Sequence, residues 1–230
     1  MTDLTAYLHS YGQIVETWAG SVRRSRRHLG LSECGHECER YLWYAHHGYA
    51  GSDPDGRMLR LFQLGNLIED QAYLDLMGAG FNIHSRQKIV SVTDGDIRLE
   101  GHIDGIIEGL LESKQPHLWE CKSANDKSFQ ALKKAGYEAW NPKYKAQIHV
   151  YMTLANLERC LVWVENKNDS TVHAERIKVN RKFAVKTLER CFNAIRRTDP
   201  PERLCPTMSF YKAKWCKFYG ECFKTERNAT

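Results

Sequence analysis

The chain has 230 residues, of which 42% are apolar and 27% are charged, and its formal net charge is +5. This length suits one well-buried domain, and the apolar content excludes an intrinsically disordered chain. No apolar run approaches the ~20 residues that span a bilayer, and the first residues lack the basic flank and apolar stretch of a signal peptide. We therefore expect a cytoplasmic protein without a membrane partner.

The basic residues are unevenly distributed along the chain. Four of the five residues at positions 23–27 are arginines, namely Arg23, Arg24, Arg26 and Arg27. A cluster of this kind suits a polyanionic partner. A solvated basic face that only aids solubility is the alternative interpretation of the same charges.

The predicted elements begin with a helix over 3–24, where apolar residues recur at helical spacing, and a loop at 48–56 that is rich in Gly, Pro and Asp. A strongly periodic helix is predicted over 57–80. Turn sequences then separate three predicted strands, at 83–92, 96–107 and 117–123. The remaining predicted elements are helices at 126–136 and 142–156, strands at 159–166 and 171–178, and a helix at 180–197.

This order of elements predicts an α/β fold with a mixed central sheet flanked by helices. We expect a single domain over 1–230. Its parts are an N-terminal helical segment (1–56) with the basic cluster, a core (57–198), and a cysteine-containing tail (199–230) that packs near the N-terminal segment.

The stretch HLWECKSAND, residues 117–126, places charged residues inside an apolar strand. Because strand side chains alternate, Glu120 and Lys122 share one face while Cys121 points to the other. Asp104 on the preceding strand can lie beside this pair. Two carboxylates of this kind suit Mg²⁺ or Mn²⁺, and the amine can orient an attacking water or help to deprotonate it. A cross-strand ion pair on a solvated sheet face is the alternative.

Two helices carry further polar residues that could complete such a site. Glu69 lies in the middle of the apolar helix before the strands, where a carboxylate facing the sheet needs a partner such as a metal ion. Gln147 and Tyr151 lie one turn apart on a later helix and could bond to a phosphate or to the site lysine. An ordinary helix surface is the alternative for this second pair.

Glu69, GHIDG, ECK, and the Gln147–Tyr151 pair, in this order over αβββα, resemble the motifs of the PD-(D/E)XK nuclease superfamily, RecB-like branch. The resemblance implies a restriction-endonuclease-like core, αβββαβ. It also implies a role for each residue: metal ligands at Glu69, Asp104, Glu120 and the Cys121 carbonyl, a catalytic lysine at Lys122, and DNA-contacting, site-bracing residues at Gln147 and Tyr151. Family members often have a histidine shortly before the helix acid, where this chain has Asn66.

The chain is most similar to phage-encoded exonuclease-like proteins of this superfamily, over roughly residues 30–223. The resemblance implies a Mg²⁺- or Mn²⁺-dependent deoxyribonuclease, in the host cytoplasm, that hydrolyses phosphodiester bonds at DNA ends or in single strands during recombination or DNA processing. Arg40 and the arginine cluster would bind DNA, and a recombination or replication protein is a possible partner. The alternatives are a site-specific endonuclease and a non-catalytic DNA-binding or scaffold protein.

Eight cysteines in an expected cytoplasmic protein indicate metal ligands or buried thiols rather than disulfides. Cys121, Cys160 and Cys191 fall within apolar patterns and are predicted to pack in the core. The segment CGHECERYLWY resembles the start of RecB-like nucleases in which one leading and three trailing cysteines hold an iron-sulfur cluster. The corresponding residues are Cys38, Cys205, Cys216 and Cys222, with Cys34 as the alternative leading ligand. A [4Fe-4S] cluster, a zinc site and unligated thiols all remain open.

Overall fold

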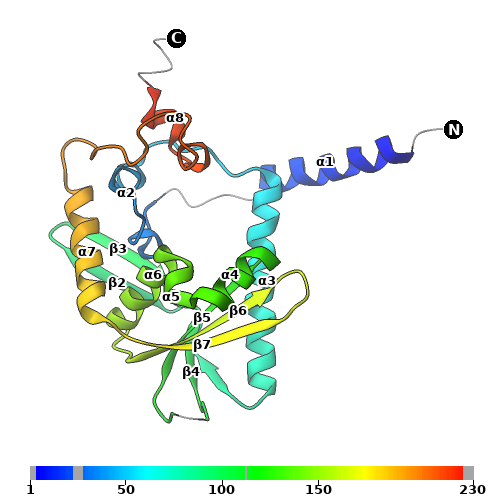
Figure 1. Ribbon diagram of the computed structural model, residues 1–230, viewed down its shortest axis with the longest axis vertical. Helices are drawn as coiled ribbons and strands as arrows, with labels where there is room; N and C mark the ends of the chain where they lie inside the picture. The colour runs from blue at the N-terminus through cyan, green and yellow to red at the C-terminus, as the bar shows by residue number, and fades with distance from the viewer. Residues whose placement is uncertain (1–3, 23–27, 112, 225–230) are drawn as a thin grey trace. The chain divides into compact units, whose positions relative to one another are not determined.

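The computed structural model describes residues 4–22, 28–111 and 113–224 (Figure 1). By their contacts, the described residues fall into two compact units. Of the described residues, the smaller comprises 4–22, 49–67 and 205–224, and the larger 28–48, 68–111 and 113–204. The predicted domain boundaries stay predictions. Within the described ranges, no helix is long and apolar enough to cross a membrane.

The helices agree with the predicted ones to within two residues at either end. They are α1 (Leu4–Val22), α2 (Glu39–His46), α3 (Gly56–Gly78), α4 (Asp126–Ala135), α5 (Tyr137–Trp140), α6 (Pro142–Leu154), α7 (Arg181–Ile195) and α8 (Tyr219–Cys222), with 3₁₀ turns η1 (Leu31–Glu33) and η2 (Ala213–Trp215). The sequence pattern did not predict α2, α5 and α8. Each of these is short, so its apolar period is too brief to recognise.

The strands form one mixed sheet of five and a separate hairpin. They are β1 (Asn82–His84), β2 (Ile89–Asp94), β3 (Ile97–His102), β4 (Gly105–Glu108), β5 (His117–Ala124), β6 (Arg159–Asn166) and β7 (Val172–Lys178). The sheet order is β1-β4-β5-β6-β7, with β5 and β6 parallel and the other neighbours antiparallel, while β2 pairs only with β3. The predicted mixed sheet is therefore confirmed.

Two of the predicted strands are each divided in the structure. The strand predicted at 83–92 breaks between β1 and β2, where Ser85 and Gln87 have positive φ values of 54° and 55°. The strand predicted at 96–107 breaks between β3 and β4 at Asp104. These breaks place the β2–β3 hairpin outside the main sheet. As a result, β1, β4 and β5 are the three leading strands of the expected αβββαβ core.

Helices cover both faces of the main sheet (Figure 1). One face packs against the C-terminal half of α3, in a buried cluster that includes Ile68, Ala72, Trp119 and Cys121. The opposite face of β5 and β6 packs against α4 and α6, and α6 in turn contacts β2 and α7. Helix α6 is therefore enclosed between the sheet, the hairpin and α7.

The segment before α3 in the larger unit also packs on α6 and α7. Arg190 on α7 donates to the carbonyls of Cys34 (3.3 Å) and His36 (2.8 Å). A Cβ added at Gly35 would lie 2.1 Å from the Cβ of Ala146, so only glycine allows this approach to α6.

In the smaller unit, α1 crosses the start of α3 closely. A Cβ at Gly56 would lie 1.8 Å from the carbonyl oxygen of Glu16. The loop before α3 meets the C-terminal region through the Ser52 amide, which donates to the Lys217 carbonyl at 2.7 Å.

Gly101 on β3 provides a test of this packing. A Cβ there would lie 2.4 Å from the hydroxyl oxygen of Tyr151 on α6. We therefore expect Gly101→Ala to lower the free energy of unfolding by about 1–3 kcal/mol, as overpacking does. Urea unfolding followed by circular dichroism measures this change. Gly65→Ala on α3, where a Cβ meets nothing within 4 Å, is the control and should stabilise by about 0.5–1 kcal/mol. Equal effects of the two variants would contradict the packing.

Candidate functional site

Strand β5 lies in the centre of the main sheet and carries the Glu120–Lys122 pair. The Glu120 side chain is 0% exposed, and that of Lys122 is 19% exposed. The Lys122 ammonium donates to Glu120 Oε1 and to the Cys121 carbonyl (3.2 Å). Cys121 points to the opposite face, into the cluster beneath α3. The predicted alternation along β5 is confirmed, but the pair lies in the interior rather than on a solvated face.

The two oxygens of the Glu120 carboxylate have different surroundings. Oε1 accepts from Lys122 and also from Gln147 Nε2 on α6, at 2.6 Å. Oε2 is buried and has no hydrogen-bond partner among the described residues. A buried acceptor without a partner is costly. This atom therefore offers a ligand position to a cation or to a donor from outside the chain.

Asp104 lies at the break between β3 and β4, and its Oδ2 accepts the backbone N–H of Cys121 at 2.8 Å. This bond places a second carboxylate against the main chain of β5, next to the Glu120–Lys122 pair. Burial, and then the charge of Asp104, raise the pKa of Glu120 to about 8 in spite of Lys122. Glu120 therefore holds its proton more readily than an exposed carboxyl group, and a bound cation would favour its charged form.

Glu69 on α3 has protein partners that the sequence did not reveal. Its Oε1 accepts from Gln87 Nε2 at 3.0 Å and from Arg86 Nη2 at 3.4 Å. Both donors come from the turn between β1 and β2. Burial, and then the charge of Asp104, raise the pKa of Glu69, so Glu69 belongs to the same electrostatic environment. Both donors bind Oε1, so Glu69 could ligate a metal through Oε2 while these hydrogen bonds are kept.

The carboxylates of this region are candidate ligands for a divalent cation. Within the described residues, no group of three or more His, Cys, Asp or Glu side chains is arranged to hold a metal ion. Mg²⁺ usually takes one or two carboxylates and completes its shell with water and substrate phosphate. Asp104, Glu120 and the Cys121 carbonyl are hard oxygen donors of that kind, and Glu120 Oε2 is available. These residues fit Mg²⁺ or Mn²⁺, and the metal roles of all four predicted ligands stay predictions.

Gln147 and Tyr151 lie on the face of α6 that points into the larger unit. Both side chains are buried, so the alternative of an ordinary exposed helix surface is wrong. Gln147 bonds to Glu120 rather than to the lysine, and the Tyr151 ring lies against Gly101. Their predicted contact with DNA stays a prediction.

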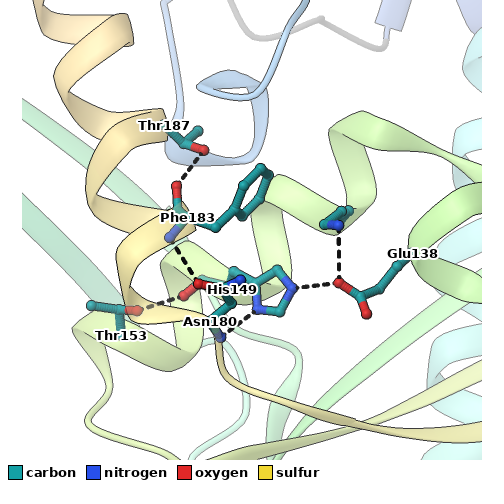
Figure 2. A network of polar contacts seen from close by, with 7 residues as sticks. Glu138, His149, Thr153, Asn180, Phe183 and Thr187 are labelled. Atoms are coloured by element: carbon teal, nitrogen blue, oxygen red, sulfur yellow. Dashed lines mark hydrogen bonds and ion pairs between the residues drawn. The ribbon is translucent and has the colours of Figure 1, made fainter.

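A polar network fixes the orientation of α6 (Figure 2). His149 lies between Gln147 and Tyr151 in sequence and is buried. Its Nδ1 accepts the backbone N–H of Asn180 (3.1 Å), and its Nε2 lies 2.8 Å from Glu138 Oε1. Since Nδ1 accepts, Nε2 carries the proton in the neutral ring and donates to Glu138.

The same network ties α6 to the helices before and after it in the chain. The Asn180 side chain caps α7 by accepting the Phe183 N–H at 3.0 Å, and Glu138 on α5 also pairs with Lys145 at 3.3 Å. His149 therefore links α5, α6 and the start of α7 (Figure 2). The helix that is fixed in this way carries Gln147, which donates to Glu120.

The cysteines differ in their burial and in the compact unit to which they belong. No cysteine of the described residues is in a disulfide, and Cys121, Cys160 and Cys191 are buried as predicted. Cys38 belongs to the larger unit, whereas Cys205, Cys216 and Cys222 belong to the smaller one. These four are half-buried. Cys34 is buried, and burial together with nearby Cys191 raises the pKa of its thiol, which disfavours the thiolate that ligates metals.

The predicted DNA-binding arginines contribute little to the described structure. Arg23, Arg24, Arg26 and Arg27 lie outside the described residues. Arg40 donates from Nε to the Pro201 carbonyl at 2.6 Å, so part of its guanidinium serves the packing of α2.

Asn66, at the position of the histidine common in the family, is exposed on α3.

Comparison with known proteins supports the fold. No protein-family model and no curated protein sequence matches this chain. It is similar to the crystal structure of SSO0001, with 14% identity and a TM-score of 0.54, over 93% of this chain and 96% of that one. It is also similar to an alkaline exonuclease from Laribacter hongkongensis, with 13% identity and a TM-score of 0.51, over 78% of this chain and 90% of that one.

At these identities the likeness shows the fold alone. The chain has a mixed α/β fold like that of the exonuclease, with a five-stranded sheet flanked by helices. The predicted fold class is confirmed.

His149→Ala tests whether the network orients α6. The change leaves Glu138 and the Asn180 N–H without their shared partner, so we expect a loss of about 1–3 kcal/mol in the free energy of unfolding. His84→Ala, at an exposed histidine that lies 3.7 Å from Glu108, is the control and should change it by less than about 0.5 kcal/mol. Urea denaturation measures both. A loss no larger than that of the control would show that the network does not hold α6.

Proposed function

We propose that this chain is a metal-dependent deoxyribonuclease of the RecB-like branch of the PD-(D/E)XK superfamily, and that it acts as an exonuclease on DNA ends or single strands. One observation carries the proposal. Glu120 has a buried oxygen without a partner, next to Asp104 and Lys122. A fold shared with an alkaline exonuclease supports the same class of reaction. A protein that only bound DNA would gain nothing from burying a carboxylate oxygen without a hydrogen-bond partner, which costs stability.

In the proposed reaction, the oxygen of a water molecule bonds to the phosphorus of a phosphodiester and the bond to the leaving oxygen breaks. The attacking water gives up a proton to solvent, and the leaving oxygen takes one from solvent. Lys122 is the most exposed member of the cluster, so the phosphodiester would approach it along its solvent edge. Burial opposes the charge on Lys122, but Glu120 and Asp104 outweigh this effect and raise the pKa of Lys122. Lys122 would therefore act as a fixed cation that holds a phosphate oxygen or orients the water, and not as a base.

The remaining residues would keep the acids in place. Gln147 and Lys122 both donate hydrogen bonds to Glu120 Oε1, so Oε2 is the carboxylate oxygen that would bind a cation. The bond from the Cys121 N–H fixes Asp104 beside it. A divalent cation held by Asp104, Glu120 and the Cys121 carbonyl would supply positive charge that offsets the charge developing on the phosphoryl group.

Lys122→Met tests this assignment, because it keeps the side-chain length and removes the charge. We expect cleavage to slow by at least about 100-fold, as when one transition-state donor is lost, while the fold is retained. The assay follows end-labelled linear duplex, single-stranded DNA and closed circular DNA with Mg²⁺, Mn²⁺ or EDTA. Lys127→Met, at an exposed lysine on α4, is the matched control and should cleave like the unchanged protein.

The three kinds of DNA substrate distinguish an exonuclease from an endonuclease and from a protein that only binds DNA. Metal-dependent loss of linear DNA with intact circles supports an exonuclease, whereas cleavage of the circles would make the protein an endonuclease. Binding without cleavage of any substrate would make it a DNA-binding or scaffold protein. Near-normal cleavage by Lys122→Met would contradict the proposed role of this lysine.

We also propose that the three cysteines of the smaller unit, Cys205, Cys216 and Cys222, are ligands of a structural [4Fe-4S] cluster or a zinc ion. The resemblance to iron-sulfur nucleases and the partial exposure of these three thiols support the assignment. The binding energy of such a metal would add to folding stability.

Cys216→Ser should remove the bound metal and lower the melting temperature, because thiolate ligation contributes folding energy. Metal analysis and visible absorption of anaerobically purified protein measure the content. Cys160→Ser, at a buried cysteine in β6, is the control and should keep any metal. Equal metal content in both variants would exclude Cys216 as a ligand.

A further inference from the structure

One aromatic ring lies beside the Lys122 ammonium, and two further aromatic residues pack around it; none of the three has a role in the cluster described above. Tyr144 on α6 has its ring centroid 5.5 Å from Lys122 Nζ. Its ring lies 5.4 Å from that of Trp140 at the end of α5, with a tilt of 53°. Tyr137, at the start of α5, lies behind both rings, at 5.9 Å from Trp140 and 6.4 Å from Tyr144. We call these three residues the aromatic wall.

The aromatic wall is buried at its back and open at its front. Tyr137 is fully buried, whereas Trp140 and Tyr144 are half-buried and so present part of their rings to solvent. The indole of Trp140 is held in place by a hydrogen bond from Nε1 to Ser128 Oγ on α4, at 3.1 Å. Ring surface that is both anchored and partly exposed suits a planar ligand, because little side-chain freedom is lost on binding.

Charge indicates what kind of planar ligand this is. Tyr144 has two ammonium groups near its ring, Lys122 at 5.5 Å and Lys143 at 5.9 Å. Lys122 uses two of its three N–H donors on Glu120 and the Cys121 carbonyl, so a phosphate oxygen could accept the third. A ligand with a phosphate at Lys122 and a flat ring on the wall meets both conditions, and a nucleotide has these two parts linked through one sugar.

We propose that Trp140 and Tyr144 stack the nucleobase adjacent to the phosphodiester that is cleaved. The inference rests on the proposed nuclease function and adds a substrate class to it. A base can lie on the wall only when it has left its own helical stack, so the site takes an unpaired nucleotide, from a single strand or a frayed end. Base–aromatic stacking of this kind tolerates any base, because each has a π face.

A double-mutant cycle between protein and DNA tests the proposal. The protein carries Glu120→Gln so that binding in Mg²⁺ is measured without cleavage. The probe is a short fluorescein-labelled single strand in which one nucleotide at a time, from each end, lacks its base, and affinity is measured by fluorescence anisotropy. At one position, loss of the base should weaken binding about tenfold, or ~1.4 kcal/mol, within the range for one stacked base.

Trp140→Ala should weaken binding of the intact strand by a similar factor and should leave no further loss when the same base is absent. Trp140→Phe should retain much of the affinity. Tyr211→Ala is the matched control, because Tyr211 is 64% exposed and also has a lysine ammonium, that of Lys212, 6.0 Å from its ring. That variant should keep the full effect of base removal.

The proposal is overturned if base removal has no effect at any position, or if the effects of base removal and Trp140→Ala simply add. Should Trp140→Ala fail to fold, the base-removal series on protein with intact Trp140, together with Trp140→Phe, still decides between these results. If the protein cleaves DNA but the effects of base removal and Trp140→Ala add, the stacking inference alone is contradicted. If the two effects are not additive but the protein never cleaves DNA, the proposed nuclease function alone is contradicted.

Discussion

A carboxylate in a protein interior must find compensation for the water that it has lost, and in this chain that requirement falls on Glu120. Lys122 and Gln147 satisfy one of its oxygens, while the other has no partner among the described residues. Asp104 adds a second negative charge beside it and is itself held by the main chain of β5. The result is a small buried region where ionising both carboxyl groups costs stability unless a cation binds.

Much of the larger unit serves to hold α6 against this region. His149 connects α6 to α5 and to the cap of α7, and the missing side chains of Gly35 and Gly101 let a loop and a strand approach the helix closely. The same α5–α6 segment presents Trp140 and Tyr144 beside Lys122. Rigid support of this kind is what a site needs when its geometry must hold reacting groups in place.

The sequence predicted the parts of this site that depend on local periodicity. Alternation along β5 separated Glu120 and Lys122 from Cys121, and helical spacing placed Gln147 and Tyr151 on one face. It did not predict the division of the strand at 83–92, because the residues with positive φ are Ser85 and Gln87 rather than glycine. The Arg86 and Gln87 contacts to Glu69 also could not be predicted, since they join elements whose approach is set by the folded sheet.

The most direct test of the account is whether the charge at Glu120 binds a divalent cation. Electron paramagnetic resonance can count free Mn²⁺ as it is titrated into the protein and into two variants, Glu120→Gln and Glu100→Gln. Glu100 lies on β3 with its side chain 44% exposed and paired to Arg98. The account predicts that Glu120→Gln weakens Mn²⁺ binding by at least about tenfold, the scale seen when metal sites lose supporting groups, while Glu100→Gln does not. Equal Mn²⁺ binding by all three proteins would contradict it.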